Sequence, residues 1–197
     1  MFARSLTLGV AAAALLAGGA QAADLIIPTT PQPIYEAAGF DWEGLYAGAR
    51  VGGSFVDTTF GATAVDTTGL VVGGAVGMNF LPADAFLLGV EATADYTWFD
   101  GGLEDRAEFF ANVRAGAVVT DSVLVYALAG AGIATQDAVG AFDDSVGMYQ
   151  LGGGVEVAVT DAVTVRGEVV GQGYFDEDVN DDFFSNAKAT VGAFYHF

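Results

Sequence analysis

The sequence predicts an all-β fold, an eight-stranded antiparallel up-and-down transmembrane β-barrel, and three observations favour it. The chain combines 53% hydrophobic residues with a net charge of -19, which membrane proteins achieve by separating the two in space. Eight segments of 11–14 residues alternate polar and apolar side chains with period two. Short and long connections alternate between them, as in barrels whose two ends face different compartments.

Composition excludes several other classes of protein. The chain has no cysteine, which excludes a disulfide framework, a thiolate zinc site and a lipidated N-terminal cysteine. The acidic balance argues against nucleic-acid binding, which needs a basic face. High hydrophobicity argues against disorder. We expect one domain, no metal centre and no cofactor.

Residues 1–22 read as a secretory signal peptide. Arg4 supplies a positive start, residues 6–17 form an apolar stretch, and Ala20-Gln21-Ala22 fits the cleavage pattern. The alternative is an uncleaved anchor helix, but the apolar stretch is short for a bilayer span.

Residues 23–43 form a Pro-rich periplasmic leader that carries three of the four prolines. A linker is the favoured interpretation of the leader, and a partner-binding segment is the alternative. The barrel is expected over residues 44–197.

One segment competes with the strand interpretation. Residues 67–83 come closest to a spanning helix, and Gly69, Gly73 and Gly77 have the spacing of a helix-packing motif. The 28 glycines and the turn signals between segments favour strands, which cross a bilayer in about 9–11 residues when tilted.

Each segment has a polar face. The first four, with the residues that mark this face, are 45–55 (Tyr46, Arg50), 70–80 (Asn79), 86–98 (Glu91, Asp95) and 106–119 (Glu108, Asn112, Arg114). The last four are 123–135 (Tyr126), 149–159 (Gln150, Glu156), 163–175 (Arg166, Glu168) and 187–197 (Lys188, Thr190, His196).

The charged residues of these segments all fall on the polar faces. They form the predicted lumen polar network: Arg50, Glu91, Asp95, Glu108, Arg114, Glu156, Arg166, Glu168 and Lys188. Five acids against four bases is nearly neutral, as an internal ion-pair network requires. Most other acids fall in the longer connections, which include residues 56–69.

Aromatic residues indicate that the apolar faces point outward. They cluster near the two ends of these faces, as the aromatic girdles of membrane barrels do. One set is Phe55, Tyr96, Trp98, Phe109, Tyr149 and Phe175, and the other is Phe80, Phe86, Tyr195 and Phe197. An open sheet edge in lipid would leave backbone groups unpaired, so the first strand should pair with the last.

The chain resembles the small Gram-negative outer-membrane barrels of the OmpA/OmpX-like, or opacity/porin, family. The resemblance rests on Gly44-Leu45-Tyr46-Ala47-Gly48, Leu88-Gly89-Val90-Glu91, Gly152-Gly153-Gly154-Val155-Glu156, Arg166-Gly167-Glu168 and the closing segment 191–197. It implies the outer membrane, external loops and periplasmic termini. It also implies that periplasmic chaperones and the barrel-assembly machinery handle the chain, and that Val191, Tyr195 and Phe197 form the assembly signal. The family's periplasmic peptidoglycan-binding domain is not expected after residue 197.

The sequence supports three hypotheses for the function. The leading one is a non-enzymatic structural and surface barrel, because eight strands enclose only enough room for side chains. A narrow porin-like channel is the alternative. A barrel-embedded lipid hydrolase is a third hypothesis, but His196 is the sole histidine and Ser185 lies at the opposite end of the same strand.

A weak cation-binding loop is a further hypothesis. It would use Asp176, Asp178, Asp181 and Asp182, whose spacing is similar to that of a calcium loop. The expected glycine and closing glutamate are replaced by Asp181 and Ala187, so a solvated acidic loop is favoured.

Overall fold

The computed structural model describes residues 39–60, 63–83, 85–100, 104–135, 145–175 and 186–197, without the side chains of residues 57–60 and 63–66. The chain divides into two units, Met1–Ala37 and Ala38–Phe197, and every described residue belongs to the second. The strands are β1 (Gly44–Phe60), β2 (Thr63–Ala83), β3 (Phe86–Phe99), β4 (Arg106–Thr120), β5 (Val123–Thr135), β6 (Ser145–Ala158), β7 (Val163–Tyr174) and β8 (Asn186–His196).

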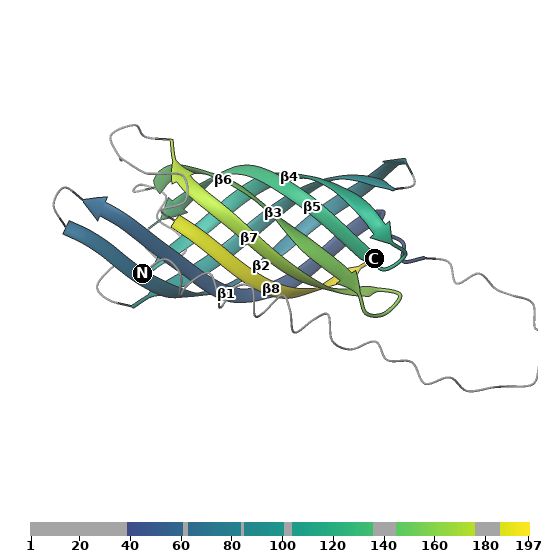
Figure 1. Cartoon of the computed structure of the whole chain (residues 1–197), viewed down its shortest axis with the longest axis horizontal. Coiled ribbons are helices and arrows are strands. Elements are labelled where there is room, and N and C mark those ends of the chain that lie inside the picture. Colours follow the sequence, from purple (N-terminus) through teal and green to yellow (C-terminus); the bar gives the residue numbers. More distant parts are fainter. Residues whose placement is uncertain (1–38, 61–62, 84, 101–103, 136–144, 176–185) are drawn as a thin grey trace, which may run out of the picture. The chain divides into compact units, whose positions relative to one another are not determined.

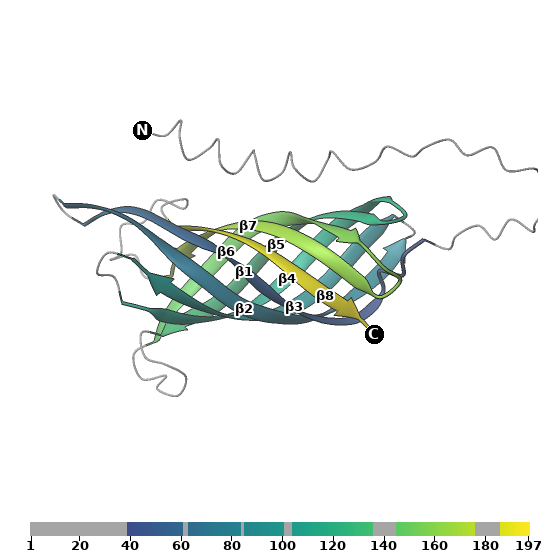
Figure 2. The same cartoon turned by 90° about the horizontal axis from the view of Figure 1, so that it is seen from below.

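These strands form one closed antiparallel barrel in sequence order (Figures 1 and 2). β1 pairs with β8 from Tyr46↔His196 to Val56↔Asn186, which closes the sheet. The predicted fold class is therefore confirmed. Among the described residues, no helix is long and apolar enough to cross a bilayer.

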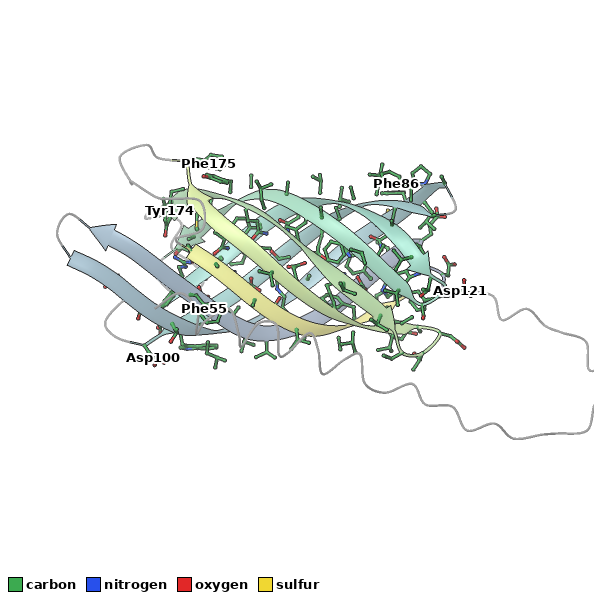
Figure 3. All side chains as sticks on the ribbon, in the orientation of Figure 1. Phe55, Phe86, Asp100, Asp121, Tyr174 and Phe175 are labelled. Atoms are coloured by element: carbon green, nitrogen blue, oxygen red, sulfur yellow. The ribbon has the colours of Figure 1, made fainter. Side chains whose placement is uncertain are left out.

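The two ends of the barrel differ. We call the end that holds the short β2–β3, β4–β5 and β6–β7 connections the turn end, and the opposite end the loop end. The turn end also holds Gly44, where β1 begins, and Phe197 after β8. Figure 3 shows Phe86 and Asp121 at the turn end, with Phe55, Asp100 and Phe175 at the loop end.

The first hairpin is longer than predicted. Residues 56–69 were expected to be a connection, but β1 continues to Phe60 and β2 begins at Thr63. This stretch is rich in threonine and valine, which favour strands. Among the described residues, the last pair of β1 with β8 is Val56↔Asn186 and the last pair of β2 with β3 is Gly69↔Phe99. Residues 57–60 pair with residues 63–66 beyond these positions. The hairpin consequently projects past the neighbouring strands (Figure 1).

The barrel is apolar outside and polar inside. Along β3 exposed and buried residues alternate almost without a break, so Val90 is 52% exposed while Glu91 beside it is 4% exposed. Exposed aromatic side chains mark both ends: Phe55, Trp98 and Phe175 at the loop end, and Phe80, Phe86, Tyr195 and Phe197 at the turn end. Tyr96, Phe109 and Tyr149 are half-buried. This is the polarity of a barrel whose solvent is lipid.

The barrel unit begins before the predicted boundary at residue 44. Phe40 donates its backbone N–H to the Asp121 carbonyl at 2.9 Å, and Trp42 is only 2% exposed. The last residues of the predicted leader, 39–43, are therefore packed against the turn end of the barrel.

Candidate functional site: the charged lumen

The structure brings the nine residues of the predicted lumen polar network together inside the barrel. All nine are buried, and every one of them takes part in at least one ion pair with another member. They come from strands on all sides of the barrel, because alternation gives each strand one inward face. The pairs form two clusters.

The turn-half cluster joins two carboxylates to two guanidinium groups. Glu156 lies 3.0 Å from Arg114 and 3.0 Å from Arg166. Glu91 accepts a hydrogen bond of 2.5 Å from Arg166 and one of 2.8 Å from the Tyr46 hydroxyl. Arg114 donates to that hydroxyl at 2.6 Å, so the tyrosine links the two charge types.

The loop-half cluster surrounds Asp95. Arg50 binds both oxygens of Asp95, at 2.8 and 2.6 Å, and reaches Glu168 at 2.9 Å. The Lys188 ammonium donates to Asp95 at 2.8 Å and also to Glu108. A bidentate arginine contact fixes geometry as well as charge, so this cluster holds β1, β3 and β7 in one arrangement.

Arg106 completes the network and was not predicted as part of it. Its Nε atom lies 2.6 Å from Glu108, and its Nη1 donates to the Tyr174 hydroxyl at 3.1 Å. With Arg106, the lumen holds five basic and five acidic residues in the part of the chain that the structure describes. Arg106 is the first residue of β4 and shares the parity of Glu108 and Arg114, and that parity could have revealed it.

Glycines on the intervening strands let these side chains meet. Tyr46 on β1 reaches Glu91 on β3 across Gly77 of β2, and Arg50 reaches Asp95 across Gly73. A Cβ on Gly77 would lie 2.3 Å from the Tyr46 hydroxyl, and one on Gly73 would lie 2.0 Å from Asp95 Oδ1.

The third contact of this kind lies on the opposite side of the barrel. The Tyr126 hydroxyl on β5 donates to Glu168 on β7 at 2.6 Å, across Gly154 of β6. A Cβ on Gly154 would lie 2.5 Å from that hydroxyl. In each of the three contacts, the two partners are separated by one strand, and that strand has a glycine at the level of the contact.

Aromatic rings pack against the guanidinium groups. Arg114 lies 4.0 Å above the ring of Tyr126, and Arg166 lies 3.8 Å above the ring of Phe194. Such contacts are stronger when the cation is removed from water, as both are here. Together with the ion pairs, they fill the middle of the lumen with side chains.

The turn half of the lumen also holds an apolar cluster that the sequence analysis did not predict. Trp42 packs there with Leu87, Leu124, Tyr126, Leu128 and Val170. These residues lie on the inward faces of β3, β5 and β7, at the parity of the charged residues. The period-two pattern could have predicted that the strand residues of this cluster face the lumen. Trp42 could not be predicted in this way, because it precedes β1 and belongs to no strand pattern.

His196 lies between this apolar cluster and the turn-half charges. Its Nε2 lies 3.2 Å from Glu156 and 3.4 Å from the Thr164 hydroxyl, while its Nδ1 has no partner among the described residues. In a hydrolytic relay the histidine lies between nucleophile and acid, with one ring nitrogen bonded to the nucleophile and the other to the acid. Here one nitrogen faces both groups, and His196 is only 7% exposed.

The other predicted residues are placed differently. Val191, Tyr195 and Phe197, the predicted assembly signal, are at least half exposed on the outer side of β8. Asp176, Asp178, Asp181, Asp182 and Ser185 lie outside the described residues. Within the described ranges, no three His, Asp or Glu side chains are grouped to hold a metal ion.

The family match and the superposition on one solved barrel domain agree with this architecture. The chain matches the outer membrane protein beta-barrel domain over residues 10–197. The N-terminal β-barrel domain of OprF from Pseudomonas aeruginosa superposes with a TM-score of 0.52 at 13% identity, covering 79% of this chain and 98% of that one. Ail from Yersinia pestis gives a TM-score of 0.45 at 15% identity, covering 79% and 100%. No curated protein matches the chain by sequence.

The outward apolar belt between aromatic rims indicates a bilayer around the barrel, and the closed sheet satisfies what a bilayer demands of the backbone. The family match identifies which membrane this bilayer is. The chain belongs to the outer membrane protein beta-barrel domain family and is a protein of the Gram-negative outer membrane.

Proposed function

We propose that this protein is a non-enzymatic structural and surface barrel whose lumen is sealed by its own side chains. The observation that carries the proposal is the balanced set of five acids and five bases, joined by direct ion pairs across the lumen. A permeating ion would have to displace contacts between buried charges, and leaving such charges unpaired is costly.

The negative charge outside the lumen suggests which surfaces the protein would contact. After Arg4 the sequence has five lysine and arginine residues, and all five belong to the lumen network. Asp100, Glu104 and Asp105 stand at the loop end, and Arg106 beside them is directed at Glu108. We propose that the acidic loops face the outside and meet cationic surfaces or envelope components, contributing to envelope integrity or surface contact.

Planar-bilayer recording tests the sealed lumen. We expect the refolded barrel to add no conductance above that of the lipid alone, because a permeating ion would have to separate these buried ion pairs. The same preparation must show a heat-modifiable band on a detergent gel, which establishes that a closed barrel was inserted. Long-lived conductance steps from heat-modifiable protein would refute the sealed lumen.

A narrow channel is the second candidate, and one observation favours it. The buried oxygens Ser54 Oγ, Thr97 Oγ1 and Asn186 Oδ1 have no protein partner within the described part of the loop half. Groups of this kind favour hydration. If the channel hypothesis holds, recordings will show small, uniform conductance steps, and the step size will change when Lys188 is replaced by methionine.

The lipid-hydrolase hypothesis has weaker support. The single nitrogen that faces both Thr164 and Glu156 is a poor geometry for a relay, and Trp42 and Phe40 cover His196 from the turn end. We therefore propose no catalytic residue. Release of fatty acid from phospholipid vesicles by the native protein, and its loss in His196→Ala, would revive the hypothesis.

We further propose that the outer side of β8 is the segment that the assembly machinery reads, after periplasmic chaperones have delivered the chain. Val191, Tyr195 and Phe197 form one exposed apolar row. Phe197→Ala should lower the amount of barrel in the outer membrane while leaving refolding in detergent unchanged. Val169→Ala, on the lipid face of β7, is the control. Equal amounts of both variants in the membrane would argue against the signal.

A further inference from the structure

The residues that precede β1 cross the turn-end mouth of the barrel. Phe40 is bonded through its backbone N–H to the carbonyl of Asp121 in the β4–β5 turn. The carbonyl of Trp42 accepts a hydrogen bond of 3.1 Å from Asn79 near the end of β2. One anchor in the β4–β5 turn and one on β2 thus hold residues 39–43 over the opening.

The side chain of Trp42 enters the lumen from this segment. It is 2% exposed and packs among Leu87, Leu124, Leu128 and Val170, whose strands lie on different sides of the barrel. Phe40, Leu81 and Val118 pack against the same cluster. Leu87 and Leu124 are fully buried, which a lumen open to water at this end would not allow.

The segment also covers the charged part of the lumen. The ring of Phe40 lies 4.9 Å from that of His196 in an edge-on arrangement, and the ring of Trp42 lies 6.1 Å away. His196 in turn contacts Glu156, the centre of the turn-half cluster. The order from the mouth inward is therefore aromatic cover, histidine, then ion pairs.

The chain turns sharply where the segment joins the barrel. Gly44 has a φ of 112°, a conformation that residues with a side chain rarely adopt. Only the Asn79 and Asp121 bonds tie the backbone of the segment to the barrel wall in the bonds described. Rotation at Gly44 would withdraw Trp42 at the loss of these two bonds and the apolar contacts.

We propose that residues 39–43 form a plug for the turn-end mouth, with Trp42 as the stopper and Gly44 as the hinge. With the plug seated, the turn half of the lumen is closed to water and to solutes from that side. With the plug withdrawn, His196, Thr164 and Glu156 become accessible, while the ion pairs deeper in the lumen keep the barrel closed. The plug is thus a second closure, separate from the charge network.

The absence of cysteine makes a labelling test clean. Thr164→Cys places a thiol beneath the plug, where Thr164 is fully buried, and Asp161→Cys places one on the exposed β6–β7 turn as a reference. The probe is a charged, membrane-impermeant maleimide added to refolded barrels in detergent. Trp42→Ala should raise the labelling rate of the thiol at position 164 by at least tenfold and leave that of the thiol at position 161 unchanged.

Trp98→Ala is the matched control, because Trp98 is the other tryptophan and lies on the outer face at the loop end. In Trp98→Ala, the thiol at position 164 should react as slowly as it does in the Thr164→Cys protein that keeps both tryptophans. An unchanged rate at position 164 in heat-modifiable Trp42→Ala protein would overturn the plug, and so would an equal acceleration by Trp98→Ala.

A second measurement keeps Trp42 in place, in case Trp42→Ala does not fold. In Trp98→Phe, the emission of Trp42 should resist both aqueous iodide and lipids brominated on their acyl chains, since the stopper touches neither solvent. In Trp42→Phe, Trp98 should be quenched by the brominated lipids. Iodide quenching of Trp42 as strong as in urea would refute the plug.

Discussion

Glycine positions decide which side chains can meet inside this barrel. Tyr46, Arg50 and Tyr126 each bond to an acid two strands away, and a glycine on the intervening strand clears the path. Period-two alternation predicts that the charges lie on inward faces, but it does not identify their partners. Partner choice depends on register and on which strands face each other across the lumen, and neither is encoded in one strand's pattern.

Gly77→Ala should destabilise the barrel. The new methyl would lie 2.3 Å from the Tyr46 hydroxyl and 2.8 Å from the Val90 carbonyl, so side chain and backbone must both move. Overpacking of this kind costs about 1–3 kcal/mol in unfolding free energy. Urea unfolding followed by tryptophan emission measures it. Gly167→Ala is the control, because a Cβ there meets nothing within 4 Å. Equal stability of the two variants would contradict the prediction.

Glu156→Gln should cost more, because it removes a charge that two arginines share. Arg114 and Arg166 both lie 3.0 Å from this carboxylate and are buried. Removing one partner of a buried ion pair typically costs about 3–5 kcal/mol. The same urea titration applies, with Glu104→Gln at the exposed loop end as the reference. A midpoint equal to that of the reference would show that the cluster adds little to stability.

At the scale of strands, period-two alternation was sufficient to predict all eight elements. It succeeded because lipid outside and charge inside give every strand two chemically distinct faces. It failed at strand ends. Residues 57–60 pair with residues 63–66 beyond the last described pairs with β8 and β3, so their pairing does not depend on the alternation of the barrel wall. Trp42 was missed because a plug segment has no strand period.

The outer faces should tolerate charge according to depth. Val76 is 58% exposed near the middle of β2, and Val159 is 55% exposed beside the β6–β7 turn. Val76→Lys should lower the unfolding free energy in lipid vesicles by about 2–4 kcal/mol, whereas Val159→Lys should cost about 0–1 kcal/mol. Urea titration in vesicles measures both. A larger cost at Val159 would mean that the bilayer is centred elsewhere on the barrel.

At the scale of the molecule, charge is sorted by compartment. Among the described residues the interior holds five acids and five bases, and the acids Asp41, Glu43, Asp100, Glu104, Asp121 and Asp161 are exposed. The near balance of charges on the strand faces already predicts this separation from the sequence. Arg106, which was not included in the predicted network, completes the balance, and its parity with Glu108 and Arg114 is the signal that indicates it.

This sorting has a consequence for proteolysis. Trypsin cuts after lysine and arginine, and beyond residue 4 the folded chain keeps all such side chains within the barrel, with only Arg106 near its rim. Beyond residue 4 the native protein should therefore survive trypsin as a single fragment, while the same part of the unfolded chain offers five cleavage points. Mass spectrometry of digests in detergent, before and after boiling, would reveal the difference. Rapid cutting at Arg114 or Arg166 before boiling would mean that the interior is open to a protease.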